Sequence, residues 1–470
     1  MTNKFISALT TKDDLTENLM STHSRSGSAV LDMFFKLGGS RDLPEDEIIK
    51  IFINAFSEDK LLALKSLFYN RDIREGQGER RSFRIIYKWL CENYPEIAEM
   101  NLILTPAFGR WDDTFVALDT PVENELLSMI VERLLNPNTS KLLKKWLPRE
   151  GKKNDIIAKK LMKLLGISPR SYRKMLSSGT DVVETKMCKN EWNKINYNHV
   201  PSIASKKYRK AFYRHDEERY SAWVESLSKP ESGNRIHAGA IFPHDIVKGY
   251  AFGSRINGTL EAQWKALPDF VQEGVNFIPV CDVSGSMRGL PMEVCVSLGI
   301  YLSQRNKSVF KDSFITFSAR PKLQLLTGKT LYEKIRQLET AHWDTNTDLE
   351  AVFRLILNQS LKNSVPKEDM PKNIIIISDM QFDMCIHSPT DTGMEMIRRM
   401  YLESGYDLPN VIFWNLRTSK GVPVKFNEQG VALISGFSPS IMKNILGGEA
   451  NPMAIMLNTL NSERYACVTL

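Results

Sequence analysis

The sequence predicts an α-helical repeat array over residues 1–270, followed by an α/β, Rossmann-like domain over residues 271–470. Two patterns predict this order. In the first part, apolar residues recur at helical spacing, and short breaks that contain Pro or Gly separate the runs. After residue 275, strand-like apolar runs alternate with helical runs, which is typical of a parallel sheet with helices on both faces. A chain of 470 residues has the length of roughly two or three domains.

Helices joined by short loops predict stacked antiparallel pairs in the first part, as in a HEAT-like array. Residues 1–25 are polar, and we expect a loosely ordered arm there. Amphipathic helices are expected at residues 46–56, 60–69, 80–94, 123–135, 140–146 and 154–165. No repeat is regular enough to assign a period. The turn-rich residues 225–269 are expected to connect the two domains.

The second part has the alternation of an α/β domain. We expect strands at residues 276–281, 313–317, 373–378, 411–416 and 431–435. The helices between them are expected at residues 292–303, 329–338, 348–357 and 394–403. A C-terminal helical segment over residues 438–460 would close the sheet.

The charge of the chain is concentrated in one stretch. Residues 141–210 hold 19 Lys and Arg against 5 Asp and Glu, a net charge of +14, whereas the whole chain carries +7. Residues 271–470 hold 20 of each sign and are neutral. Such asymmetry is typical of a protein that binds a polyanion, although solvated helix faces are the alternative.

The six cysteines show no paired spacing, and we expect reduced thiols in a cytoplasmic protein. The first residues lack the apolar core of a signal peptide, and no apolar run is long enough to cross a membrane. We therefore expect no membrane association.

A motif with metal-binding chemistry follows the first expected strand of the second part. Asp282, Ser284 and Ser286 alternate on a glycine-containing turn between a strand and a helix. One carboxylate and two hydroxyls suit Mg²⁺ better than Zn²⁺. The alternative is a simple strand-to-helix turn in which Ser284 or Ser286 caps the helix.

Two later segments complete the pattern. Thr347 precedes an expected helix, and Asp379 follows the buried-strand signature of residues 373–378. The three segments together resemble the metal-ion-dependent adhesion site of von Willebrand factor A domains. The resemblance implies a Mg²⁺ held by Asp282, Ser284, Ser286, Thr347 and Asp379, with Thr345 as an alternative to Thr347. It also implies that a carboxylate from a partner would fill the open metal position.

A helical array followed by an A domain resembles the Ro ribonucleoprotein (TROVE) family, in a viral or microbial branch. The resemblance rests on the metal motif in the second part, and on domain order, helicity and the basic stretch in the first. It implies a ring of helical repeats that the A domain closes. It also implies binding of small structured RNA on a basic outer face and of single-stranded RNA ends in the hole.

The residues expected to bind RNA fall in two groups. Cations interleave with aromatic residues over residues 205–215, a composition suited to phosphate contact and base stacking. The candidates are Lys206, Lys207, Arg209, Lys210 and Arg214, and a second group of Arg170, Arg173 and Lys174 near a helix start. Tyr208 and Phe212 are expected in the core. The Gly-containing loop of residues 71–81 either presents backbone N–H groups to phosphate or has its arginines neutralised internally.

No catalytic motif is present: the histidines lack metalloprotease spacing, and there is no GxSxG. We therefore expect a non-enzymatic, monomeric RNA-binding protein. The alternative is a protein-interaction adaptor or chaperone cofactor that engages an ATPase or virion component through the metal site, without RNA.

Overall fold

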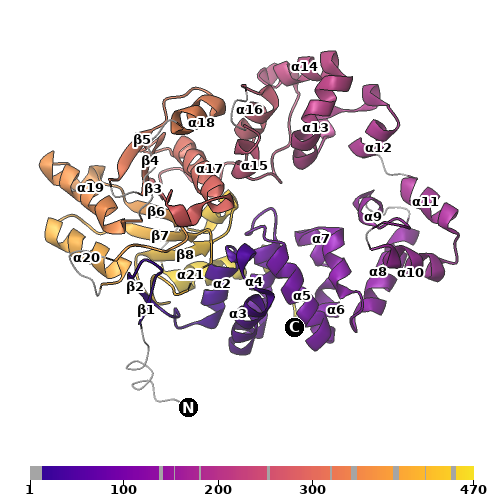
Figure 1. Cartoon of the computed structure of the whole chain (residues 1–470), viewed down its shortest axis with the longest axis horizontal. Coiled ribbons are helices and arrows are strands. Elements are labelled where there is room, and N and C mark those ends of the chain that lie inside the picture. The colour runs from indigo at the N-terminus through magenta and orange to yellow at the C-terminus, as the bar shows by residue number, and fades with distance from the viewer. Residues whose placement is uncertain are drawn as a thin grey trace.

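The computed structural model describes residues 13–136, 141–152, 154–178, 182–250, 255–317, 320–339, 347–384, 391–418, 420–445 and 451–470. Its helices follow a ring-shaped path, and both ends of that path contact a C-terminal α/β domain (Figure 1). The helices of the first part are α2 (Ala29–Leu37), α3 (Glu45–Glu58), α4 (Lys60–Arg71), α5 (Arg81–Asn93), α6 (Pro95–Leu102), α7 (Thr105–Phe108), α8 (Glu123–Leu135), α9 (Lys141–Trp146), α10 (Asp155–Leu165), α11 (Pro169–Ser177), α12 (Val183–Cys188), α13 (Ser202–His215), α14 (Glu217–Ser226), α15 (Pro243–Val247) and α16 (Gly258–Lys265).

Consecutive helices of the first part pack on one another, as their amphipathic spacing predicts. In α3, for example, Ile48, Phe52 and Phe56 are buried while the opposite face carries charged residues. The contacts run from α2 through α3, α4 and α5 to α8 and α10, and later from α13 to α14 and α16. A separate, smaller hydrophobic cluster around Phe212 and Tyr220 holds α13 and α14 together.

The C-terminal domain has a six-stranded mixed sheet. Its strands are β3 (Phe277–Cys281), β4 (Ser313–Thr316), β5 (Lys322–Leu325), β6 (Asn373–Ser378), β7 (Asn410–Asn415) and β8 (Val431–Ser435), and its helices are α17 (Leu290–Arg305), α18 (Leu331–Glu339), α19 (Leu349–Lys362), α20 (Gly393–Ser404) and α21 (Pro452–Leu460). The strand order is β5-β4-β3-β6-β7-β8, and only β5 is antiparallel to its neighbour. This is the doubly wound order, whose switch point lies between β3 and β6.

The expectation of a purely parallel sheet was therefore wrong at one edge. The four residues of β5 are exposed or partly exposed, so the segment lacks the apolar signature of a buried strand. A very short edge strand of this kind also resists pairing with another chain.

The N-terminal segment is not a loose arm where the structure describes it. Residues 13–25 include β1 (Asp13–Leu15) and β2 (Ser21–His23), which pair with each other, and bridges link this segment to the C-terminal domain at Asp383, Thr392 and Val422. Residues 1–12 lie outside the described residues. The polar composition was misleading because polar side chains and backbone groups of this segment both form hydrogen bonds with the C-terminal domain.

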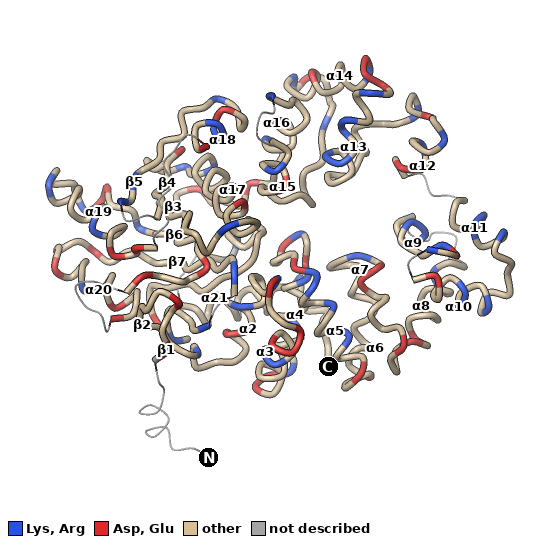
Figure 2. Tube along the Cα trace, viewed as in Figure 1, with Lys and Arg blue, Asp and Glu red and all other residues tan. Residues whose placement is uncertain are grey.

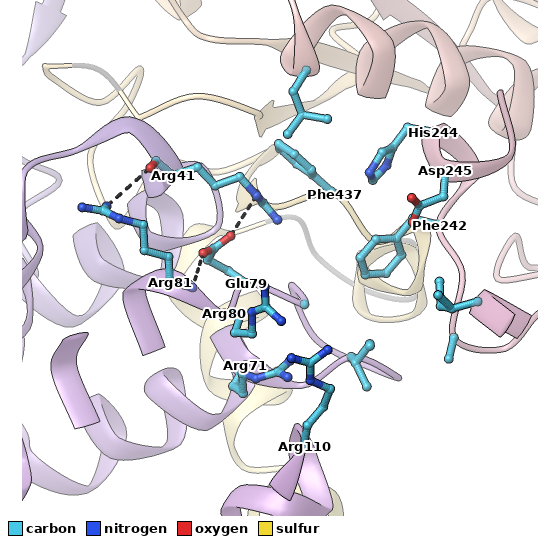
Figure 3. A pocket seen from close by; sticks show the side chains of 15 residues that line it. Arg41, Arg71, Glu79, Arg80, Arg81, Arg110, Phe242, His244, Asp245 and Phe437 are labelled. Atoms are coloured by element: carbon cyan, nitrogen blue, oxygen red, sulfur yellow. Dashed lines mark hydrogen bonds and ion pairs between the residues drawn. The ribbon is translucent and has the colours of Figure 1, made fainter. Parts of the chain in front are cut away.

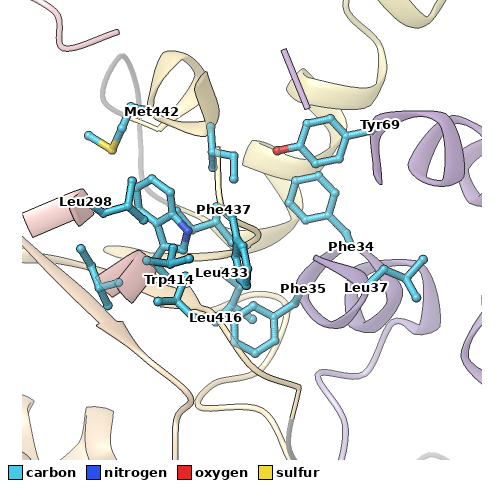
Figure 4. Packing of buried hydrophobic residues seen from close by; sticks show 14 of the residues in the cluster. Phe34, Phe35, Leu37, Tyr69, Leu298, Trp414, Leu416, Leu433, Phe437 and Met442 are labelled. Atoms are coloured by element: carbon cyan, nitrogen blue, oxygen red, sulfur yellow. The ribbon is translucent and has the colours of Figure 1, made fainter. Parts of the chain in front are cut away.

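The first helix is fastened to the last strand. The hydroxyl of Ser435 accepts hydrogen bonds from Gly38 N (3.2 Å) and Gln77 Nε2 (2.9 Å), and it donates to the carbonyl of Phe34 (3.0 Å). Phe34 and Phe35 of α2 pack toward Phe437 and the sheet (Figure 4). Because this contact joins residues about 400 positions apart, it closes one side of the ring.

The other side of the ring closes through α15 and α16. Glu261 in α16 accepts hydrogen bonds from the backbone N–H groups of Leu331 and Tyr332 at the start of α18, each at 2.9 Å. Lys248, directly after α15, pairs with Glu293 in α17 at 2.6 Å. The carboxylate of Glu261 thus caps a helix of the C-terminal domain from outside it.

Candidate functional site

The predicted metal-site residues lie at the carboxyl ends of the two strands that flank the switch point. Asp282 directly follows β3, and its N–H donates to the carbonyl of Ile377 in β6 at 2.9 Å. Asp379 directly follows β6. Open α/β sheets place their ligands at this position, because the connections there diverge and leave a crevice.

Hydrogen bonds bring four of the five predicted ligands together. Asp282 Oδ1 accepts from Ser284 N at 2.9 Å, and the hydroxyls of Ser284 and Ser286 lie 3.1 Å apart. Ser286 is also hydrogen-bonded to the side chain of Asp379. Ser378, which sequence reasoning missed, donates its hydroxyl proton to Asp282 Oδ2.

Thr347 is buried one residue before the N-cap of α19, where Asp348 accepts from Ala351 N at 2.7 Å. It is tied to the loop after β6, because Thr347 N donates to Asp383 Oδ2 and Asp383 N donates to the Thr347 carbonyl, both at 3.0 Å. The alternative ligand Thr345 lies outside the described residues.

Two buried carboxylates face each other across this site. Burial, together with the charge of the neighbouring Asp379, raises the pKa of Asp282 to about 6. Burial also raises the pKa of Asp379, with Arg417 opposing the shift and Glu17 adding to it. Both shifts mean that the environment disfavours the ionised carboxylates unless a cation is near.

The donor set fits a hard cation. It contains carboxylate and hydroxyl oxygens and no sulfur or nitrogen, which is the set that Mg²⁺ prefers. In the part of the chain that the structure describes, no three His, Cys, Asp or Glu side chains are grouped to hold a metal. Hydroxyls would therefore have to complete the coordination of any ion at Asp282 and Asp379.

The N-terminal segment lies at the rim of this site. Thr16 Oγ1 donates to the carbonyl of Phe382 at 2.7 Å, and Asn18 Nδ2 donates to that of Gln381 at 2.9 Å. The N–H of Met384 donates in turn to the Asn18 carbonyl at 3.0 Å. No local sequence signal pairs Thr16–Asn18 with a loop more than 360 residues away.

The first group of predicted RNA-binding residues lies on α13. Its members differ in how exposed they are and in whether they already pair with another residue. Lys207, Lys210 and Arg214 are exposed. Lys206 is half-buried and pairs with Asp245 at 3.1 Å, and Arg209 donates to the carbonyl of Lys206 at 2.7 Å. Lys206 and Arg209 are therefore partly committed to the fold.

The aromatic residues of α13 are structural. Phe212 is fully buried, and Tyr208 packs partly buried against the same cluster. At the end of the helix, the exposed His215 stacks on Trp192 with ring centroids 4.4 Å apart.

The second group lies on α11, which begins as predicted. Ser168 accepts from Ser171 N at 3.2 Å, and Pro169 is the first helical residue. Arg170, Arg173 and Lys174 are exposed, and Arg173 lies 3.4 Å from Glu150. The α11 and α13 groups occupy different parts of the ring (Figure 2).

The loop of residues 71–81 does not present its central N–H groups to a ligand. Gln77 N donates to the carbonyl of Tyr69 (3.0 Å), and the N–H groups of Gly78 and Glu79 also donate within the protein. Glu79 pairs with Arg41 at 2.8 Å and Arg71 pairs with Asp113 at 2.7 Å, so these charged residues of the loop are neutralised by residues outside it. The hypothesis of a backbone phosphate cradle was wrong here.

No helix among the described residues is both long and apolar enough to cross a membrane.

Two family models match the chain, one over each of its two parts. Residues 16–109 and 122–274 match a family described as a domain of unknown function (DUF2828), and residues 276–462 match a second (DUF7788). The uncharacterized protein L728 of Acanthamoeba polyphaga mimivirus is 32% identical over 499 residues, which cover 95% of this chain and 86% of that protein. The solved structure of the Ro (RSR) protein of Deinococcus radiodurans aligns with 93% of this chain and 99% of its own, at 13% identity and a TM-score of 0.38. Since the first model covers more than half of the sequence and the viral relative matches most of it, the chain belongs to the DUF2828 family.

Proposed function

We propose that this protein is a non-enzymatic, cytoplasmic RNA-binding protein of the Ro type that acts as a monomer and contacts RNA through α13 and α11. The observation that carries the proposal is the set of exposed cations without ion pairs. Among the described residues, Lys207, Lys210 and Arg214 have no carboxylate partner, in contrast to Lys206. Exposed, uncompensated cations on one helix favour a phosphate backbone as the ligand.

The neighbouring groups support this assignment. Arg170 and Lys174 of α11 are also exposed and without a carboxylate partner in the described ranges. Arg170 lies in the first turn of α11, where a cation opposes the helix dipole, so a bound anion there would relieve an unfavourable field, whereas Lys174 lies in the last turn. His215, stacked on Trp192, adds an exposed ring at the end of α13 that could stack on a base.

The test is the salt dependence of RNA binding. Replacing Lys207, Lys210 and Arg214 with Gln should weaken binding of single-stranded RNA and lower the slope of log K against log salt by about 2, at about 0.7 per lost phosphate contact. The control replaces Lys311, Lys362 and Lys372 with Gln. These lysines are equally exposed and lie in the neutral C-terminal domain, so the net charge changes by the same amount. Equal slopes for both variants would remove α13 from the RNA site.

We further propose that the C-terminal domain is a von Willebrand factor A domain with Mg²⁺ held by Asp282, Ser284, Ser286, Thr347 and Asp379. The strand order, the place of the motif at the switch point and the oxygen donor set support this. When bound, the ion would supply an open coordination position for a carboxylate of a partner. The chain's own contribution is to hold two buried carboxylates close together and to orient the hydroxyls.

A thermal melt tests the metal assignment. Mg²⁺ should raise the melting temperature of the wild type over that in chelator, because a ligand of the folded state stabilises it, by about 2.7 kcal/mol at 100 times Kd. Asp282→Ala should remove the increment, whereas Asp369→Ala, an exposed carboxylate of the same domain, should keep it. A wild type indifferent to Mg²⁺ would refute the metal site. A stoichiometric protein complex that chelator dissociates, in a protein that binds no RNA, would instead support the adaptor function.

A further inference from the structure

A cavity of about 550 Å³ lies between the first helices, the segment around α15 and the C-terminal domain (Figure 3). Five arginines line it against two carboxylates: Arg41, Arg71, Arg80, Arg81 and Arg110 against Glu79 and Asp245. The volume falls in the range of small-molecule sites, about 300–1,000 Å³. The cavity can therefore hold a small organic anion, and its lining has an excess of positive charge.

Most of these arginines already have partners. Arg71 is buried and pairs with Asp113 at 2.7 Å, and Arg41 pairs with Glu79. Arg110 pairs with Asp112 at 2.6 Å and stacks over Trp146. These pairs fix the shape of the arginine wall, and they neutralise much of its charge.

Arg80 is the exception. Its side chain is exposed to the cavity, and within the described residues no carboxylate or carbonyl bonds to its guanidinium. Desolvation lowers the pKa of Arg80, and the charges of Arg110 and Arg84 lower it further. Asp113 and Asp112 offset these positive charges in part, and a bound anion would offset them further.

The opposite wall carries the rings of Phe242 and His244 and the carboxylate of Asp245 (Figure 3). The ring of Phe242 packs against the backbone at Gly78, where an added Cβ would lie 2.5 Å from the ring. His244 is 7% exposed, and its Nδ1 has no hydrogen-bond partner among the described residues. Asp245, beside it, is engaged by Lys206 at 3.1 Å. This wall suits a planar ring, and the carboxylate of Asp245 excludes a phosphate from it.

We propose that the cavity binds a small phosphorylated ligand that carries an aromatic ring, of the class of nucleoside monophosphates. Arg80, with Arg110 beside it, would receive the phosphate, because guanidinium groups match phosphate oxygens in charge and geometry. Phe242 would receive the planar ring by offset stacking. This assignment does not depend on RNA binding by α13, whose Ile203 lines the cavity but whose exposed Lys207, Lys210 and Arg214 do not.

Calorimetric titration of the intact protein with AMP, adenosine and inorganic phosphate tests the proposal at low ionic strength. AMP should bind more tightly than either half of the molecule. Arg80→Gln should weaken AMP binding about ten- to a hundredfold, as expected for a lost hydrogen bond to a charged group, and should leave adenosine binding unchanged. Phe242→Leu should weaken AMP and adenosine together.

Arg74→Gln is the matched control, because Arg74 is an exposed arginine of the same loop that does not line this cavity. Arg80 has no partner to lose, so Arg80→Gln should melt like the wild type. The α13 variant Lys207/Lys210/Arg214→Gln should still bind AMP, which separates this proposal from the RNA-binding function. The proposal is overturned if AMP does not bind at millimolar concentration, if Arg80→Gln binds it normally, or if only a single-stranded RNA binds in an Arg80-dependent manner.

Discussion

Gly38→Ala should open the contact between the first helix and the last strand. A Cβ at residue 38 would lie 2.6 Å from Gly436 N and from the carbonyl carbon of Ser435, and backbone atoms cannot rotate away. Gly38 has φ −63°, so alanine meets no conformational strain of its own. The effect of the substitution is therefore steric.

The expected loss of stability combines two destabilising contributions and one that opposes them. Overpacking a tight interface costs about 1–3 kcal/mol. Loss of the hydrogen bond from Gly38 N to Ser435 Oγ adds about 1 kcal/mol. Replacing glycine at a compatible position recovers about 0.4–1 kcal/mol through the unfolded state. We therefore expect a net loss of about 1–4 kcal/mol, localised at α2 and β8.

Hydrogen exchange measured by mass spectrometry reports this local loss. Amides of α2 and β8 should exchange faster in Gly38→Ala than in the wild type. A local loss of one kcal/mol corresponds to about 5-fold faster exchange, and a loss of two kcal/mol to about 30-fold. Gly239→Ala serves as the control, because an added Cβ there meets no atom within 4 Å. Protection in α2 that equals or exceeds that of the wild type would refute the proposed role of this contact in closing the ring.

Two further predictions concern buried charge. Asp113→Ala should destabilise the helical part by about 3–5 kcal/mol in chemical denaturation, because it leaves the buried Arg71 without its partner, whereas removing the exposed Asp46 should have little effect. Burial lowers the pKa of His244 to about 4, with Asp245 opposing the shift and Arg41 adding to it. Because the unfolded chain takes up this proton first, the contribution of His244 to stability is complete above pH 6.5 and is lost as the pH falls toward 4, up to about 3 kcal/mol. Between pH 7 and pH 5, the unfolding midpoint of the wild type should therefore fall more than that of His244→Gln. A parallel pH dependence in the two proteins would contradict the assignment.

Local patterns sufficed for most elements of the fold. The four isoleucines of β6 and the apolar spacing of α3 are signals that each segment carries by itself. The edge strand β5 carries no such signal, since its residues stay largely exposed. The docking of residues 13–25 depends on hydrogen bonds to loops more than 360 residues further along the chain, so composition could not reveal it.

The candidate sites also differ in whether a local sequence pattern predicts them. The spacing of Asp282, Ser284 and Ser286 is local, and the parallel sheet places Asp379 beside them. The arginine cavity is not local, because Arg80 and Phe242 meet only when the ring closes. Sequence patterns also could not distinguish the exposed Lys207 from Lys206, whose partner Asp245 lies 39 residues away.

The fastening of α2 to β8 has a consequence for synthesis of the chain. Gly38 and Ser435 are 397 residues apart, so at about 5–20 residues per second the first helix leaves the ribosome roughly 20–80 s before its partner strand exists. During that interval Phe34 and Phe35, which are almost fully buried in the finished protein, have no sheet to cover them. Nascent chains stalled before residue 431 should therefore bind chaperones through α2, and release should coincide with the emergence of β8.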